Sequence, residues 1–131
     1  MIPSSDLKSI ARARLQDAKV LLSGRRLDGA VYLGGYAVEL ALKARICRTL
    51  KWTGFPETAA EFKGLQSIKT HDLDILLRLS GVEGRIKTKF MAEWSLVLDW
   101  DPEKRYQTAG QFTEQQANDR IAAATKLLGV L

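Results

Sequence analysis

The sequence predicts an all-α protein: an antiparallel, up-and-down helical bundle of four long helices plus one or two short ones. Three observations favour this fold class. Apolar residues recur at steps of three and four along most of the chain, which is the period of an amphipathic helix. The stretch 30–44 is apolar on nearly every side, so other helices must bury it. Stretches of alternating β-branched residues joined by an Asn-Gly or Asp-Gly turn are missing, so no strand is expected.

The composition is that of an ordinary soluble globular protein, for which the cytoplasm is the expected compartment. Its 131 residues suit one domain over 1–131, with 46% hydrophobic and 27% charged residues. The first residues lack a basic region followed by an apolar run, which argues against a secretory signal. The net charge of +5 permits a phosphate-bearing partner without requiring one. One cysteine, Cys47, and one histidine are too few for a zinc cluster, so no metal or cofactor is expected, and Cys47 is interpreted as a buried apolar residue.

The first helix is expected to begin at Ser4 or Ser5, because serine accepts hydrogen bonds from the free amides of a first turn. Gly24 is the expected stop. The residues that recur at helical spacing and should face the core are Leu7, Ala11, Leu15, Ala18 and Leu22.

The second helix is the central one, expected from an Asp28 cap to about Thr49. Gly34 and Gly35 lie in its middle, where each glycine costs roughly 1 kcal/mol relative to alanine. Two explanations remain open for this pair. The backbone of a neighbouring helix approaches closely there, or the helix is locally irregular or kinked.

The remaining elements are marked by caps and breakers. Between 51 and 69 the pattern breaks, with either a short helix over Glu57–Leu65 or a mobile flap. Thr70 is the expected cap of a short helix that Gly81 ends. A longer helix is expected over Glu83–Trp100, ended by Asp101-Pro102. The last helix opens with the Thr113 and Gln116 capping box, and its expected inward residues are Ala117, Ile121, Ala124 and Leu128.

Polar residues form a stripe along the central helix. Tyr32, Tyr36, Glu39 and Lys43 follow one another at steps of four, three and four, so they share one helix face. Glu39 and Lys43 have the acid-first order that favours a helical ion pair. The stripe is predicted either to line a ligand-binding cleft or to hold a satisfied ion pair with packed tyrosine rings.

A basic segment follows the stripe and contains no acid: Lys43, Arg45, Arg48, Lys51 and Trp52. Such a segment could neutralise phosphates and stack a base on Trp52. The alternative is a solvated helix end with cations at its negative pole. A second basic run, Arg85, Lys87 and Lys89, is interpreted as an exposed helix face.

Three further residues are candidates for catalysis: His71, Arg105 and Tyr106. His71 is the only histidine, and a general base needs a partner within hydrogen-bond reach. Arg105 and Tyr106 follow Asp101-Pro102 and could reach a ligand or only brace their loop. Phosphate-binding glycine loops and metal-ligand spacings are not found.

Several segments together resemble one family, the HEPN domain (higher eukaryotes and prokaryotes nucleotide-binding). The segment 30–46, Ala-Val-Tyr-Leu-Gly-Gly-Tyr-Ala-Val-Glu-Leu-Ala-Leu-Lys-Ala-Arg-Ile, is the most specific match, and 13–22 precedes it before a Gly-Arg-Arg-Leu-Asp turn. Thr70-His-Asp-Leu73 is similar to the family's His-Asp-Leu segment. Trp100-Asp-Pro-Glu-Lys-Arg-Tyr106 is similar to its Trp…Arg-Tyr segment.

The resemblance implies an up-and-down helical bundle that usually forms a homodimer. Many members are RNases in toxin–antitoxin, antiviral or RNA-processing systems, and others are partners of small nucleotidyltransferases or non-catalytic binders. The RNase members carry an arginine and then a histidine, spaced by four to six residues. Here the matching positions hold Gly64, Leu65 and Gln66 before His71, and 110–112 hold Gly, Gln and Phe after Arg105. The usual metal-independent RNase pair is therefore absent.

Three functions follow as hypotheses. The first is a HEPN-like module that binds nucleotide, RNA or a nucleotidyltransferase partner without the usual RNase activity. Its expected ligand-binding residues are Tyr32, Tyr36, Glu39, Lys43, Arg45, Arg48 and Trp52. The second is a divergent ribonuclease toxin that uses His71, Arg105 or Tyr106. The third is a structural dimerisation module.

Overall fold

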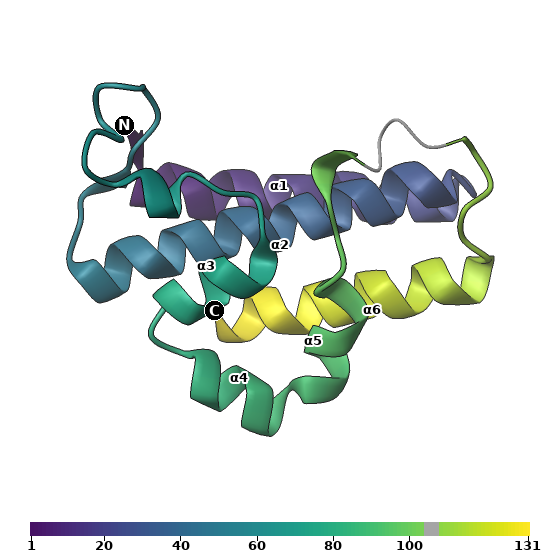
Figure 1. Ribbon diagram of the computed structural model, residues 1–131. Helices are drawn as coiled ribbons and strands as arrows, with labels where there is room; N and C mark the ends of the chain where they lie inside the picture. Colours follow the sequence, from purple (N-terminus) through teal and green to yellow (C-terminus); the bar gives the residue numbers. More distant parts are fainter. Residues whose placement is uncertain (104–107) are drawn as a thin grey trace.

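The computed structural model describes residues 1–103 and 108–131, and it confirms an all-α helical bundle (Figure 1). Three helices are long: α1 (Ser4–Ser23), α2 (Leu27–Leu50) and α6 (Glu114–Val130). Three have seven residues each: α3 (Leu73–Leu79), α4 (Glu83–Lys89) and α5 (Met91–Val97). A 3₁₀ turn, η1, covers Gln66–Ile68.

The long helices are joined so that the chain runs along α1 and returns along α2. After α3, α4 and α5 the chain crosses to the end where α2 begins and then runs along α6 in the same direction as α2 (Figure 1). The Asp28 carboxylate ties the beginnings of α2 and α6 together, because it accepts the backbone N–H groups of Gly110 and Gln111 at 2.6 and 3.1 Å. The sequence predicted Asp28 as the cap of its own helix. That was wrong, since α2 already begins at Leu27 and Asp28 lies in its first turn.

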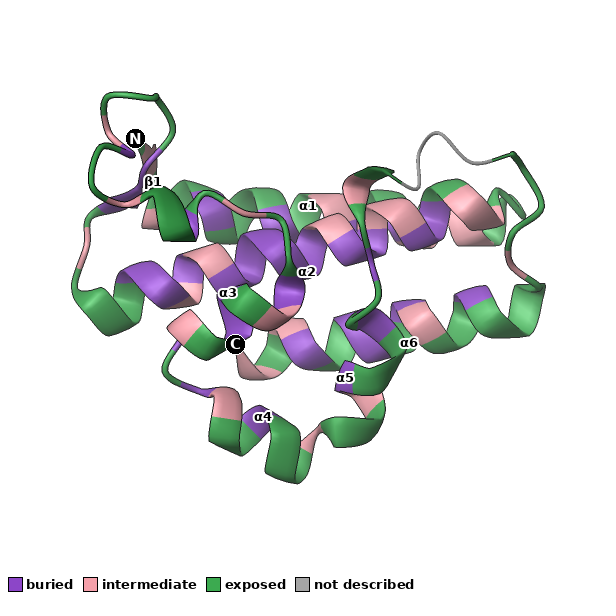
Figure 2. Ribbon diagram, viewed as in Figure 1, coloured by how far each residue is buried: buried purple, intermediate pink, exposed green. Residues whose placement is uncertain are grey.

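The α2 helix is the centre of the core, as its all-round apolar composition predicted. Of its 24 residues 13 are buried, including Cys47 (Figure 2). It packs against α1, α3 and α6 and against the short strand β2 (Gly54–Phe55). Burial raises the pKa of the Cys47 thiol, as expected for an apolar environment around a residue that acts as a small hydrophobic side chain.

The two glycines of α2 are explained by close packing. A Cβ at Gly34 would lie 2.7 Å from Ile121 of α6, and a Cβ at Gly35 would overlap the indole of Trp100. The close approach of a neighbouring helix backbone that the sequence predicted is wrong, because the atoms that fill these positions belong to the side chains of Ile121 and Trp100. The Trp100 indole then donates its Nε1–H to the carbonyl oxygen of Tyr32 at 3.0 Å, which fixes the segment after α5 to α2.

The long helix predicted over Glu83–Trp100 is wrong, because it is divided into α4 and α5. Phe90 lies between them with φ −130° and ψ 29°, outside the helical region. The break lets Ile86 from α4 and Trp94 from α5 both enter the core, where each is almost fully buried. In a single straight helix, one axis would fix the directions of both the Ile86 and the Trp94 side chains.

Other differences concern helix starts and the segment 51–72. Glu57–Leu65 forms turns rather than the short helix offered from sequence, with Gly64 at φ +80°. The α3 helix is capped by Asp72, whose carboxylate accepts from the N–H groups of Asp74 and Ile75, and not by Thr70. Thr70 acts one step earlier by accepting from the N–H of Asp72 at 3.0 Å. Pro3 precedes α1 without a side-chain cap, so the expected serine cap is wrong as well.

Two predictions at the ends of the chain have opposite outcomes. The Thr113–Gln116 capping box opens α6 as predicted, with both reciprocal hydrogen bonds present. The expectation of no strand is wrong in one small place, since β1 (Ile2–Pro3) pairs antiparallel with β2. Two residues cannot show a strand period, so this pairing left no pattern to detect.

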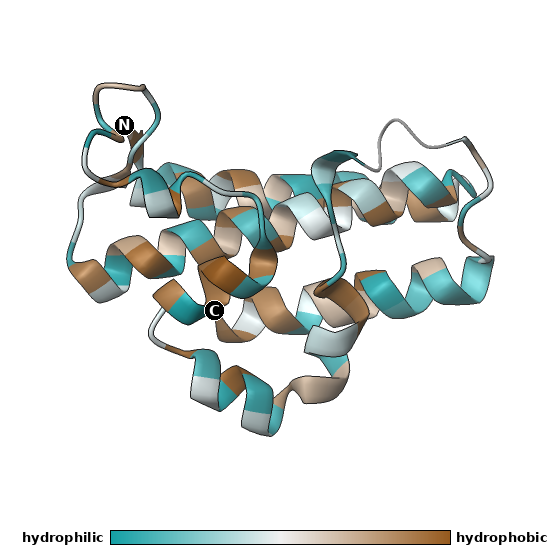
Figure 3. Cartoon of the chain, viewed as in Figure 1, coloured by the Kyte–Doolittle hydropathy of each residue, from teal (hydrophilic) through white to brown (hydrophobic). Residues whose placement is uncertain are grey.

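The α6 helix becomes more hydrophobic from its first turn toward its end (Figure 3). Figure 3 shows hydrophilic residues over the first part of this helix and more hydrophobic residues toward its end. Ala117, Ile121 and Ala124 are buried as predicted, whereas Leu128 is half-buried. In the described part of the chain, no helix combines the length and the apolar composition that crossing a membrane requires.

The packing of Gly35 against Trp100 generates a stability prediction. Gly35→Ala should lower the free energy of unfolding by about 1–3 kcal/mol, because the new methyl group forces the indole to move in a filled core. Gly84→Ala on α4 is the matched control, since open space surrounds that position and alanine favours a helix. Urea unfolding of both variants measures the difference. Equal stabilities of the two variants would contradict the packing explanation.

Candidate functional site

The polar stripe of α2 is built around the Glu39 carboxylate. Glu39 is 1% exposed and is the only charged side chain among the described residues that are buried. A buried carboxylate is stable only when charged or hydrogen-bonding partners replace its water. Lys43 supplies one such partner, with its Nζ 3.7 Å from Glu39 Oε2, as the sequence predicted from the spacing. The Lys43 ammonium also lies 5.3 Å from the ring centre of Phe55 in β2.

His71 supplies the second partner of Glu39. Its Nδ1 lies 2.5 Å from Glu39 Oε1, so the two carboxylate oxygens contact two different basic groups. The Asp72 cap fixes the chain immediately after His71, which holds the imidazole over α2. The rest of the ring faces solvent, because the His71 side chain is 62% exposed. The structure therefore joins a residue of the central helix to the lone histidine 32 positions further along.

The two tyrosines of the stripe pack on Trp100. Their ring centres lie 6.0 Å (Tyr32) and 6.5 Å (Tyr36) from that of Trp100, both in tilted arrangements. Burial raises the pKa of the Tyr36 phenol, and the negative charge of Glu39 adds to the increase. The ion pair and ring packing that the sequence offered as one interpretation are thus present. A ligand-binding role for these four residues stays a prediction.

A depression beside His71 is strongly acidic. It has a volume of about 370 Å³, and Trp100 forms part of its wall. The acids that line it are Asp72, Asp99, Asp101 and Glu103. Among the described residues no three Asp, Glu, His or Cys side chains converge to hold a metal ion. The candidates Arg105 and Tyr106 lie outside the described residues.

The basic segment at the end of α2 is divided between two sides of the molecule. Lys43 belongs to the polar stripe and pairs with Glu39, whereas Arg45 and Arg48 line a groove on another side of the helix. Lys51 ends α2 in a left-handed conformation with φ 56°, and Trp52 packs half-buried against the core. Neither Lys51 nor Trp52 lines the groove. A helix turns about 100° per residue, so consecutive cations cannot share one face.

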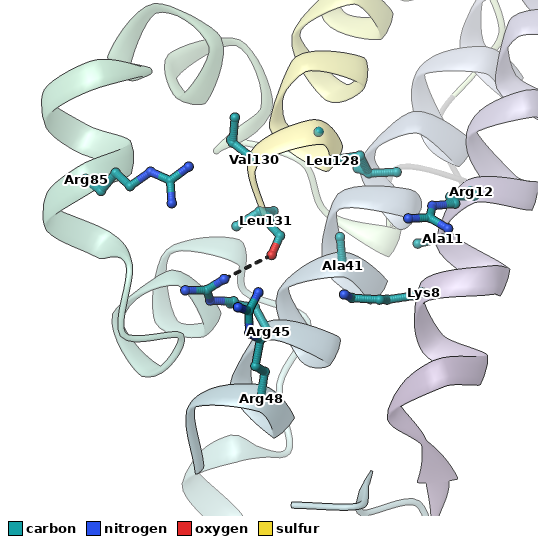
Figure 4. Close-up of a pocket in the computed structure, with 11 residues that line it drawn as sticks. Lys8, Ala11, Arg12, Ala41, Arg45, Arg48, Arg85, Leu128, Val130 and Leu131 are labelled. Carbon is teal, nitrogen blue, oxygen red and sulfur yellow. Dashed lines mark hydrogen bonds between the residues drawn. The ribbon is translucent and has the colours of Figure 1, made fainter. Parts of the chain in front are cut away.

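The groove lies between α1, α2, α4 and the end of α6 and has a volume of about 420 Å³ (Figure 4). Five cations line it: Lys8, Arg12, Arg45, Arg48 and Arg85. Figure 4 shows Lys8 and Arg12 reaching toward it from α1 and Arg85 reaching from α4 on the opposite side. Burial lowers the pKa of the Arg45 guanidinium, and the nearby charges of Arg48 and Arg85 lower it further.

Comparison with known families decides what kind of domain this is. Residues 4–131, nearly the whole chain, match the HEPN domain. The chain belongs to the HEPN family. No curated protein and no solved structure matched it. The family assigns this HEPN domain to nucleotide- or RNA-related proteins, many of which are RNases or toxins.

Sequence analysis missed three residues of this HEPN domain's groove. Lys8 and Arg12 lie away from the apolar stripe of the first helix and were not among the predicted site residues, and Arg85 was interpreted as part of an exposed helix face. The spacing of Lys8 and Arg12 already shows that they share a face of α1. Their proximity to Arg45 and Arg85 depends on how three helices pack, which no spacing within one helix reveals.

The Glu39–Lys43 pair generates a double-mutant prediction. Glu39→Gln and Lys43→Met should each lower the free energy of unfolding by roughly 1–3 kcal/mol, because each leaves a partner less satisfied. Their coupling energy should be about 0.5–3 kcal/mol. Glu83→Gln and Lys87→Met form the matched control, since that pair has the same order and spacing but lies at the surface. The control coupling should be near zero, and an additive Glu39–Lys43 cycle would show that the buried pair does not stabilise the fold.

The Tyr36 phenol generates a pH prediction. Its ordinary pKa is 10.0 and its folded pKa is higher, so below pH 10 the phenol is neutral in both states. As the pH rises through the folded pKa, the unfolded chain ionises first and the wild type loses stability. Tyr36→Phe should lose less stability over the same interval. Unfolding measured from pH 8 upward tests this, and parallel curves for both proteins would contradict it.

Proposed function

We propose that this HEPN domain binds nucleotide, RNA or a nucleotidyltransferase partner and lacks the metal-independent RNase activity of many relatives. Membership of the family supports the nucleotide- or RNA-related role. The process in which it acts is proposed to be a toxin–antitoxin or defence system. The resemblance also favours a homodimer, which sedimentation velocity would measure directly.

One observation carries the proposal that it binds rather than cleaves: the surroundings of His71. The depression beside it is lined by Asp72, Asp101 and Glu103. Negative charges at this position repel the phosphates of an RNA chain. The positions where RNase members carry a partner arginine hold Gly64, Leu65 and Gln66.

A divergent ribonuclease is the second candidate, and the His71–Glu39 contact favours it. A carboxylate at Nδ1 orients an imidazole, and Nε2 then remains available for proton transfer. In this role His71 would be the general base, and Glu39 would position it. Arg105 and Tyr106 are the other two residues proposed for catalysis.

Binding and cleavage assays on the same protein test the proposal. RNA and ATP titrations over a salt series should show saturable binding that weakens as salt rises, because phosphates release counterions. Purification of the tagged protein from its source cells should show whether a nucleotidyltransferase accompanies it. Saturable binding to neither ligand, together with no such partner, would contradict the proposal.

The cleavage arm separates the two candidates. Wild type and His71→Ala should leave a panel of RNAs equally intact if the domain only binds. Cleavage by wild type that His71→Ala abolishes would establish the ribonuclease instead. Equal cleavage by both proteins would identify a contaminating nuclease, which repurification would remove.

A further inference from the structure

The groove between α1, α2, α4 and α6 gathers five positively charged side chains. Lys8, Arg12, Arg45, Arg48 and Arg85 line it, and none of the described residues that line it is an aspartate or glutamate. Several cations elsewhere in the fold have carboxylate partners. On α6, Arg120 pairs with Asp99 at 3.0 Å and Lys126 with Glu93 at 3.1 Å. Like charges brought together repel each other unless an anion joins them.

The guanidinium of Arg45 is only partly hydrogen-bonded. Its Nη1 donates to the Leu131 carbonyl oxygen over 3.4 Å, a long hydrogen bond (Figure 4). Its Nε is buried and has no hydrogen-bond partner. Burial and the charges of Arg48 and Arg85 both lower its pKa, which is the response of a cation held among cations. An anion bound in the groove would offset the repulsion between Arg45, Arg48 and Arg85 and stabilise the charged guanidinium of Arg45.

The side chains present indicate which anion suits the groove. Four of the five cations are arginines, whose planar guanidinium groups match the oxygens of phosphate in pairs. The cations come from three helices on different sides of a volume of about 420 Å³, so one small ion would not reach all of them. No aromatic ring is among the described residues that line the groove, so it offers no surface for stacking a base.

We infer that this groove binds consecutive phosphate groups, held by Arg45, Arg48 and Arg85 with Lys8 and Arg12 on the opposite wall. The ligand is the polyphosphate end of a nucleotide or the backbone of single-stranded RNA. Recognition is of phosphates and not of bases. This inference rests on the proposed function for the identity of the ligand, and it adds the place where the ligand binds.

The test uses two exposed arginines and a matched control. Arg48→Gln and Arg85→Gln each remove one groove cation, whereas Lys89→Gln removes an exposed charge from the same helix as Arg85 but outside the groove. Thermal unfolding of all three variants should match the wild type. Arg45 is left intact because its side chain also contacts Leu131.

The probes are tripolyphosphate, ATP, AMP and a short oligouridine, each titrated calorimetrically. Wild type should bind tripolyphosphate and ATP more tightly than AMP, because AMP carries a single phosphate. Arg48→Gln and Arg85→Gln should each weaken binding roughly tenfold, the effect expected for one charge-assisted hydrogen bond. Lys89→Gln should stay within about twofold of wild type, since an exposed charge outside the site contributes little.

Oligouridine distinguishes the two sources of phosphate. If RNA occupies the groove, tripolyphosphate should compete with it, and each arginine variant should reduce the slope of log affinity against log salt by about 0.7. If only ATP and tripolyphosphate respond to the arginine variants, the ligand is a nucleotide polyphosphate. Both outcomes support the groove.

Two results would overturn the inference. One is no tripolyphosphate binding by wild type, and the other is equal affinities of Arg48→Gln, Arg85→Gln and Lys89→Gln for every probe. If RNA or ATP still binds in that case, the proposed function stands and only the site is wrong. Tripolyphosphate bound by the arginines without any binding of RNA or ATP would instead support the groove and contradict the nucleotide- and RNA-binding part of the proposed function.

Discussion

Complete burial of α2 is the constraint on which the rest of this HEPN domain depends. A helix that is apolar on nearly every side is stable in water only when neighbours cover all of it. Here α1, α3 and α6 cover it, and Trp100 and Ile121 fill the space that Gly35 and Gly34 leave open. The glycines therefore have a packing role that offsets their low helix propensity. The break at Phe90 lets Ile86 of α4 and Trp94 of α5 both enter the core.

Burial of α2 also explains how its one buried charge is satisfied. The Glu39 carboxylate lies inside the bundle and holds Lys43 from its own helix and His71 from the segment before α3. Phe55, which contacts the Lys43 ammonium, belongs to the strand that pairs with the start of the chain. One carboxylate therefore connects three separate parts of the sequence. A histidine placed this way serves the fold whether or not it also serves catalysis.

Charge is distributed unevenly over the surface that surrounds this core. The depression beside His71 is lined by acids, whereas the groove beside Arg45 is lined by cations. A net charge of +5 therefore understates how strongly each region would attract or repel a phosphate. The family relates the chain to nucleotides and RNA, and the groove is the region whose charge suits such ligands. His71 therefore lies beside the acidic depression and not beside the groove that the five cations line.

The sequence by itself determined the fold class, the long helices α1, α2 and α6 and the Glu39–Lys43 pair, because helical period, capping residues and i, i+4 spacing are local signals. It did not determine the break at Phe90, the Asp28 contact with Gly110 and Gln111, or the pairing of Ile2 with Phe55. These depend on which surfaces meet. The candidate site shows the same division: His71 could be named as the lone histidine, but its contact with Glu39 joins residues 32 positions apart. The five-cation groove was decided only by tertiary structure, since helix packing alone brings Lys8, Arg45 and Arg85 to one place.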